Sequence, residues 1–263
     1  MTTTVSNNIT NKHGKGAYLK RYWWLTLIFL SLILGITIVA LIPPSAAPMP
    51  EASSALESDT SITVSTSPWL SFTPTGKELE TGLIIYPGGR VDPSAYAPSA
   101  RALAKQGYLV TIVPMPLDLA FFNPNAAMDV IETYPEVENW AIGGHSLGGV
   151  AAAQFVSNHP SEVSGIYFWG SYPANSDDLT QIPNLTAVSI YGTNDGLSTP
   201  EKVLAASPLL PQDTMFVPID GGNHAQFGWY GEQNGDLSAT ISREIQQKQI
   251  VDATAHLLET ISK

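Results

Sequence analysis

The hydrophobic and polar positions of this chain follow one repeating pattern from about residue 62 onward. Two short alternating segments, 62–65 and 69–72, predict a leading pair of antiparallel strands. Continuous apolar runs come next, as is typical of strands buried on both faces. There are six of them: Leu83–Tyr86, Tyr108–Val113, Trp140–Ile142, Ile166–Trp169, Ala187–Tyr191 and Thr214–Ile219.

Segments with helical periodicity separate these runs. They cover 94–106, 125–133, 147–158, 200–206 and 243–261. Because strands and helices alternate, the pattern predicts an α/β fold with a mostly parallel central sheet of about eight strands and helices on both faces. Ligands bind such sheets beyond the carboxyl ends of the strands. Catalytic or ligand-binding residues are therefore expected in the segments that come after the apolar runs.

The N-terminal part has a different pattern. Tyr22–Ile42 is an unbroken run of 21 residues without a charge, and as a helix it would span about 30 Å, the thickness of a bilayer core. Basic residues precede the run at positions 12, 15, 20 and 21, and no acidic residue occurs before residue 43. This pattern predicts a cytoplasmic tail at 1–21, a single transmembrane anchor at 22–42 and an extracytoplasmic remainder. Cleavage of a signal peptide near Ser45-Ala46-Ala47, which would give a secreted protein, is the alternative.

Composition divides the rest of the chain into two parts. Residues 43–61 are rich in Pro, Ala and Ser, which predicts a linker without a core, and 62–263 form the folded domain. The formal charge of −11 separates into +4 before residue 43 and −15 after it. A charge of −15 argues against a nucleic-acid partner, whose phosphates need clustered Lys and Arg. The absence of cysteine excludes disulfides, thiolate zinc sites and a cysteine nucleophile.

A candidate nucleophile lies just after the run 140–142. Gly144-His145-Ser146-Leu147-Gly148 has the form G-x-S-x-G and opens the helical segment 147–158. A serine on a strand-to-helix turn needs a strained backbone and close packing, so glycines flank it at −2 and +2. The free N–H groups of the helix N-terminus would face an oxyanion formed there. Ser146 is therefore the expected nucleophile.

A serine nucleophile needs a general base and an acid that orients the base. Of the histidines after Ser146, only His224 comes after a strand, in a glycine-rich loop; His159 ends a helix and His256 lies inside one. Asp195 comes after the penultimate core strand and precedes His224, so it is the expected acid. Asp220, which also ends a strand, is the alternative.

An oxyanion hole needs a second backbone donor besides the N–H of Leu147. The loop Pro87-Gly88-Gly89-Arg90 comes after an earlier strand, and Gly89 is the expected donor, with Arg90 as the alternative. Only 16 residues, 170–185, lie where many hydrolases carry a cap domain, so the site should be shallow and open. The expected substrate-pocket residues are His145, Tyr172, Gln226, Phe227 and Tyr230, and further aromatic residues expected at its edge are Phe121, Phe122, Trp169 and Trp229.

Four segments together resemble the α/β-hydrolase superfamily, and in particular the small bacterial alpha/beta hydrolase fold-5 group, related to dienelactone-hydrolase-like enzymes. They are YPGGRVDP at 86–93, GGHSLGG at 143–149, IYGTNDG at 190–196 and GGNHAQFGWYG at 221–231. The resemblance covers roughly 66–260 and implies an eight-stranded hydrolase sheet and a Ser146–Asp195–His224 triad. Pro87 stands where lipases with an HGGG-type loop carry histidine, so the second oxyanion donor cannot be taken from the resemblance.

These features predict a membrane-anchored serine hydrolase acting on small-molecule or lipid-like esters. No cofactor or metal is expected, because the sequence has neither an H-x-x-x-H pair nor a dinucleotide or phosphate-binding loop. Two alternatives remain open. An acyltransferase would use the same triad with an acceptor in place of water, and a non-catalytic envelope binding module would keep the fold without the reaction.

Overall fold

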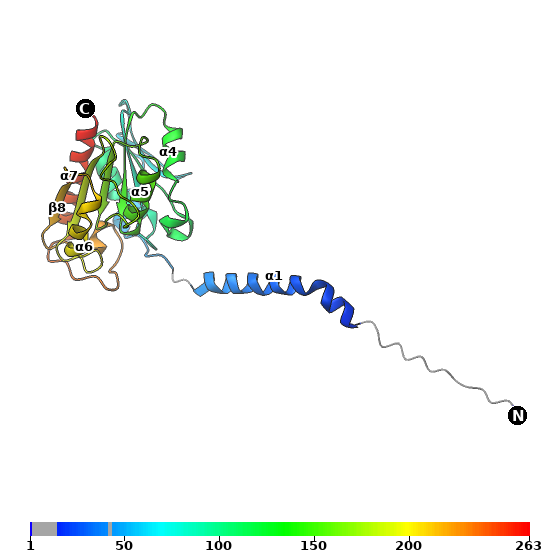
Figure 1. The fold of residues 1–263 in the computed structure, drawn as a ribbon. Coiled ribbons are helices and arrows are strands. Elements are labelled where there is room, and N and C mark those ends of the chain that lie inside the picture. Colours follow the sequence, from blue (N-terminus) through cyan, green and yellow to red (C-terminus); the bar gives the residue numbers. More distant parts are fainter. Residues whose placement is uncertain (2–14, 42–43) are drawn as a thin grey trace. The chain divides into compact units, whose positions relative to one another are not determined.

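Eight strands form a single sheet in the computed structural model (Figure 1), which describes residues 1, 15–41 and 44–263. The strands occur in the order β1-β2-β4-β3-β5-β6-β7-β8. Their bounds are β1 Ile62–Ser65, β2 Leu70–Pro74, β3 Thr81–Tyr86, β4 Leu109–Ile112, β5 Asn139–His145, β6 Gly165–Trp169, β7 Thr186–Gly192 and β8 Met215–Ile219. β1 and β2 pair antiparallel, β2 pairs antiparallel with β4, and the other pairings are parallel. The predicted sheet and its leading antiparallel pair are confirmed.

Helices cover both faces of this sheet, and Figure 1 shows α7 on the opposite face from α4 and α5. The helices of residues 45–263 are α2 Pro50–Ser54, α3 Ala97–Ala104, α4 Ala127–Thr133, α5 Leu147–Asn158, α6 Pro200–Ala205 and α7 Arg243–Ile261. Short 3₁₀ turns lie at η1 Pro93–Tyr96, η2 Pro116–Asp118, η3 Ala120–Phe122, η4 Ser207–Leu209 and η5 Ala225–Phe227. The predicted helix over 94–106 is divided into η1 and α3, next to Pro98, which has no backbone N–H to donate.

Alternation along the buried strands builds two cores. On β3, Leu83 and Ile85 face the core beneath α3 and α7, whereas Ile84 and Tyr86 face the core beneath α4 and α5. Successive side chains of a strand point to opposite faces, so an unbroken apolar run fills both layers. These two layers hold the strand ends in a fixed register, and the candidate site lies at those ends.

The segment 45–61 packs on the sheet domain, although its composition predicted a linker. The N–H of Ala46 donates to the carbonyl of Arg90 at 2.7 Å, and the N–H of Met49 donates to the carbonyl of Trp229 at 2.8 Å. The composition was misleading because the backbone of such a segment can still donate and accept hydrogen bonds. Here the backbone N–H groups of Ala46 and Met49 find acceptors on the loops after β3 and β8.

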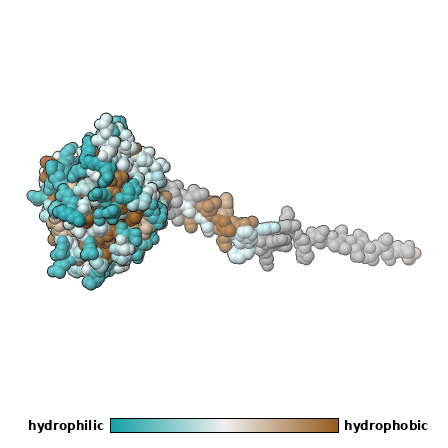
Figure 2. Space-filling model, turned by 90° about the horizontal axis from the view of Figure 1, so that it is seen from above, coloured by the Kyte–Doolittle hydropathy of each residue, from teal (hydrophilic) through white to brown (hydrophobic). Residues whose placement is uncertain are grey.

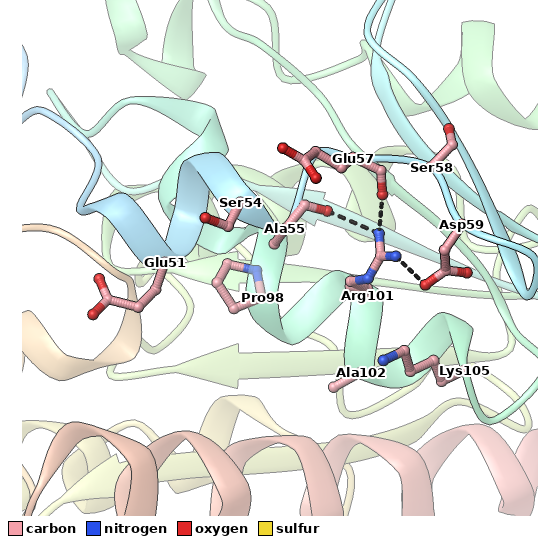
Figure 3. Close-up of a pocket in the computed structure, with 10 residues that line it drawn as sticks. All are labelled: Glu51, Ser54, Ala55, Glu57, Ser58, Asp59, Pro98, Arg101, Ala102 and Lys105. Atoms are coloured by element: carbon pink, nitrogen blue, oxygen red, sulfur yellow. Dashed lines mark hydrogen bonds and ion pairs between the residues drawn. The ribbon is translucent and has the colours of Figure 1, made fainter.

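α2 continues this packing, with the side chain of Ala52 fully buried. Arg101 of α3 then holds the residues that come after α2 (Figure 3). Its guanidinium donates to three acceptors: the carbonyls of Ala55 and Glu57 and the carboxylate of Asp59. The compact unit consequently begins at Ser45 and not at residue 62.

Residues 15–41 form the helix α1, within the separate unit Met1–Pro44. Over the residues that the structure describes, no helix is both long and apolar enough to cross a membrane. The predicted transmembrane anchor at 22–42 is therefore not shown. Its last residue, 42, and residues 2–14 of the predicted tail lie outside the described residues.

Candidate active site

Ser146 occupies a strained turn between β5 and α5. Its φ of 50° and ψ of −120° lie outside the regions that a non-glycine residue ordinarily adopts. Its N–H donates to the carbonyl of Trp169 at 3.1 Å, and its carbonyl accepts the hydroxyl of Ser171 at 2.6 Å. Hydrogen bonds to β6 and to the residues after it thus hold the strained turn in place. Ser146 is partly exposed at the carboxyl ends of the strands, as the sequence predicted.

His224 and Asp195 form a buried pair at the ends of β8 and β7. His224 Nδ1 lies 2.7 Å from Asp195 Oδ2, and both side chains are completely buried. The other carboxylate oxygen, Oδ1, accepts the N–H groups of Leu197 and Ser198 at 2.8 and 2.7 Å. With both oxygens occupied in this way the carboxylate is fixed, and it orients the imidazole.

The second nitrogen of the His224 ring, Nε2, is not used by the pair with Asp195. This atom is buried and has no hydrogen-bond partner in the part of the chain that the structure describes. The ring centroid lies 4.4 Å from that of His145, the residue before Ser146. The structure thus brings the loops of the three predicted catalytic residues together. Asp220, the alternative acid, is exposed, and its carboxylate accepts the Thr193 hydroxyl.

Asp236 connects the loops that carry Asp195 and His224, a role that the sequence did not predict. Its carboxylate accepts the N–H groups of Gly196, His224 and Ala225 at 3.0, 3.2 and 2.8 Å. The turn after His224 is therefore tied to the turn after Asp195. An acidic residue in the glycine-containing loop after His224 was the only available signal, and its partners depend on how that loop folds back.

The loop after β3, which lies against Leu147, has one amide without an acceptor among the described residues. Gly88 donates its N–H to the hydroxyl of Tyr96 at 2.9 Å, and Arg90 donates its N–H to the carbonyl of Asp118 at 2.8 Å. Between them, the N–H of Gly89 has no acceptor among the described residues. A Cβ built on Gly89 would lie 3.1 Å from Leu147 Cδ2, so Gly89 lies against the side chain of Leu147. The N–H of Leu147 begins α5 and has no intrahelical acceptor. These hydrogen bonds favour Gly89 over Arg90.

His145, one of the expected pocket residues, is almost completely buried, and its place in a substrate pocket stays a prediction. Only 1% of the residue is exposed, and its Nδ1 lies 2.9 Å from the hydroxyl of Tyr96. Because that hydroxyl already accepts from Gly88, its own proton is free to be donated to Nδ1. Burial lowers the pKa of His145 well below 6.5, and the nearby ring of His224 lowers it further. His145 is therefore neutral, and it lies between Tyr96, which bonds to the loop after β3, and the ring of His224.

A family model described as the alpha/beta hydrolase family matches residues 82–248. The chain belongs to the alpha/beta hydrolase family. Among solved structures, an esterase domain from a Rhodothermus marinus protein has the same fold, with a TM-score of 0.55 and 14% sequence identity. The match covers 74% of this chain and 93% of the esterase domain. No curated protein matches the sequence.

The other expected pocket residues of this hydrolase-family chain fall into two groups. Phe227 and Tyr230 are buried in the core beneath α3 and α7, and their predicted place in a substrate pocket stays a prediction. Their rings pack beside His145, because aromatic side chains bury more area against that layer than at the surface. Tyr172 and Gln226 are partly exposed. They line two different cavities, of about 440 and 330 Å³, and not one common pocket.

A larger cavity, of about 520 Å³, lies between α2 and α3 (Figure 3). Acidic and basic side chains line it, and it contains none of Ser146, Asp195 and His224. Arg101, its central cation, already bonds to the segment after α2. The described residues contain no group of three or more His, Cys, Asp or Glu side chains arranged to hold a metal ion.

Gly148 has no room for a side chain, so we expect Gly148→Ala to damage both stability and activity. A Cβ there would collide with the carbonyl oxygen of Tyr86 and lie 2.5 Å from that of Pro87. Both atoms belong to the backbone, so α5 must move away from β3. We expect the free energy of unfolding to fall by about 2–3 kcal/mol. Denaturant titration measures this change, with Gly231→Ala as control because nothing lies within 4 Å of its Cβ. Equal stability of the two variants would contradict this packing.

Burial of neutral His145 predicts a loss of stability in acid. Below pH 6.5 the unfolded chain binds a proton at this residue, whereas the folded chain does not, because its pKa is lowered. As the pH is lowered, the free energy of unfolding should therefore decrease by up to about 1.4 kcal/mol per pH unit. Titrations between pH 7 and 5 should show a shallower dependence in His145→Asn. Parallel pH profiles for the two proteins would rule out this effect.

Proposed function

We propose that this chain is a serine hydrolase that acts on ester bonds. The observation that carries the proposal is the buried Asp195–His224 pair, whose free Nε2 lies at the same edge of the sheet as the strained Ser146. A serine, an aspartate and a histidine in this chain order are typical of the alpha/beta hydrolase reaction. The Rhodothermus marinus domain shares the fold and is an esterase, which supports esters as the first substrates to test.

The proposed reaction has two halves. Ser146 Oγ attacks the ester carbonyl while His224 Nε2 takes the hydroxyl proton, and Asp195 stabilises the imidazolium that forms. The N–H groups of Leu147 and Gly89 donate to the oxyanion of the tetrahedral intermediate. His224 then protonates the leaving alcohol, and the acyl group stays on Ser146. Water, deprotonated by His224, releases the acid and restores the serine.

The test is turnover of short-chain aryl esters by the full-length chain. We expect release of the aryl alcohol at a rate that does not depend on any added acceptor. An acyltransferase, the second candidate, would release it only when an alcohol or amine is added. Absence of turnover in both conditions, together with no labelling by a fluorophosphonate, would overturn the hydrolase proposal and favour a binding module.

We also propose that residues 22–42 anchor the chain in a membrane, with the hydrolase domain outside the cytoplasm. The support is the uncharged run with its four preceding basic residues. The hydrogen bond of Ala46 to Arg90 argues against cleavage after Ala47, which would remove this contact. Carbonate-washed membranes should retain a chain with an intact N-terminus. A soluble chain that begins near Pro48 would instead show cleavage and secretion.

A further inference from the structure

Few large hydrophobic side chains are exposed on the unit 45–263, and half of the exposed ones occur in one short segment. Six such residues are exposed in this unit: Leu117, Phe121, Phe122, Leu204, Leu237 and Ile245. The first three lie within 117–122, between β4 and α4, and are 45, 50 and 53% exposed. Figure 2 shows, on one face, that hydrophobic surface occurs in patches among hydrophilic ones. Three large apolar groups in six residues are more than scattered exposure explains.

This segment is held in place beside the oxyanion loop. The carbonyl of Asp118 accepts the N–H of Arg90 at 2.8 Å, and the carbonyl of Leu117 accepts Arg90 Nη1 at 3.0 Å. The carboxylate of Asp118 accepts the hydroxyl of Ser45. The segment is thus fixed from two sides, by the loop after β3 and by the start of the compact unit.

Backbone strain is concentrated at the same edge. Five non-glycine residues of the described chain have positive φ, and four of them are Arg90, Leu117, Asp118 and Ser146. Leu117 and Asp118 are consecutive, with φ of 54° and 53°. Strain of this kind persists only where the surroundings enforce it, and it gathers at binding and catalytic sites. Here it holds Leu117 outward, in water.

Apolar side chains of the segment lie near the residue that follows Ser146. A Cβ built on Gly89 would lie 3.1 Å from Leu147 Cδ2 and 3.6 Å from Leu119 Cδ2, so these two leucines flank the proposed oxyanion donor. Phe121 and Phe122, which lie just beyond Leu119 in the chain, pair with their ring centroids 4.3 Å apart. Two leucines beside Gly89 and a pair of exposed rings thus belong to one short stretch of chain and the start of α5. We call Leu117, Leu119, Phe121, Phe122 and Leu147 the apolar rim.

We propose that the apolar rim binds the hydrocarbon chain of the ester substrate. The inference rests on the proposed function and specifies its substrate class: esters with an unbranched apolar acyl or alkyl chain, in preference to acetyl esters. Asp118 is the only charged residue within 116–122, and its carboxylate is engaged by Ser45. A hydrocarbon chain lying on the rim would cover the exposed leucine and phenylalanines and lose its own hydration.

The test is the dependence of hydrolysis on chain length. We expect the full-length chain to have a higher kcat/KM for p-nitrophenyl octanoate than for the acetate. The double variant Phe121→Ser/Phe122→Ser should lower the octanoate-to-acetate ratio about tenfold. Ile245→Ser is the matched control, since Ile245 is 52% exposed on α7 and does not belong to the rim. It should keep the native ratio.

Three results would overturn the proposal. The ratio could remain native in the double variant, or the control could lower it equally. The double variant could also lose a dimer in sedimentation while keeping the ratio, in which case the rim contacts a second copy. If the native chain neither hydrolyses esters nor reacts with a fluorophosphonate, the proposed function fails. Binding of decanoate to the native chain and to the double variant, measured by calorimetric titration, then tests the apolar rim separately. The double variant should bind decanoate at least about tenfold more weakly than the native chain. Equal binding by the two proteins would reject the apolar rim as a hydrocarbon site.

Discussion

Ser146→Ala should abolish ester hydrolysis and leave the fold intact. Its hydroxyl is the proposed nucleophile, and His224, the proposed base, has an Nε2 without a hydrogen-bond partner among the described residues, so loss of the hydroxyl should lower kcat by on the order of 10³-fold or more. The backbone hydrogen bonds of Ser146 to Trp169 and Ser171 do not use its hydroxyl. The circular dichroism spectrum and Tm of the variant should therefore match those of the native chain.

A matched control separates this effect from the mere loss of a serine. Ser161 is exposed in the loop after α5, and its hydroxyl donates to its neighbour Glu162. Ser161→Ala should hydrolyse aryl esters at the native rate. If Ser146→Ala kept more than about a tenth of native turnover, the nucleophile would have to be another residue.

Asp195→Asn should lower kcat roughly 10⁴-fold without unfolding the chain. The amide oxygen of asparagine can still accept the N–H groups of Leu197 and Ser198, so its NH₂ group turns toward His224. An NH₂ group donates, and His224 Nδ1 must then accept. The ring proton therefore moves to Nε2, which can no longer take the proton of Ser146. Steady-state kinetics should show the loss mainly in kcat.

Asp220→Asn is the control for this second prediction, because Asp220 was the alternative acid in the sequence. Its side chain is exposed, and it accepts a long hydrogen bond of 3.3 Å from Thr193. The variant should keep nearly native kcat. A large loss in Asp220→Asn with little loss in Asp195→Asn would reverse the assignment.

Much of the fold could be predicted because the signals were local. Alternating segments and continuous apolar runs predicted all eight strands within a few residues, and both buried layers arise from the alternation within runs such as 83–86. Ser146, Asp195 and His224 were found by their positions after strands. The resemblance to the alpha/beta hydrolase group implied that these three residues form one triad. The structure agrees with their placement at the strand ends, and their catalytic roles stay predictions.

The remainder depended on contacts between distant residues. His145, Phe227 and Tyr230 have the residue types of a pocket wall, yet all three are almost completely buried, with both aromatic rings packed beside His145. Asp236 lies 40 residues after Gly196 in the chain and bonds both to the turn after Asp195 and to the turn after His224, and no local pattern marks such a partner. The segment 45–61 has a linker composition, but its backbone found acceptors on two loops of the domain.

The most direct test of the proposed nucleophile is the site of covalent labelling. The full-length chain is treated with a fluorophosphonate, its intact mass is measured, and the modified peptide is sequenced by mass spectrometry. We predict one adduct per chain, on Ser146, and none in Ser146→Ala. No adduct on the native chain, or a stoichiometric adduct on a different residue, would contradict the assignment.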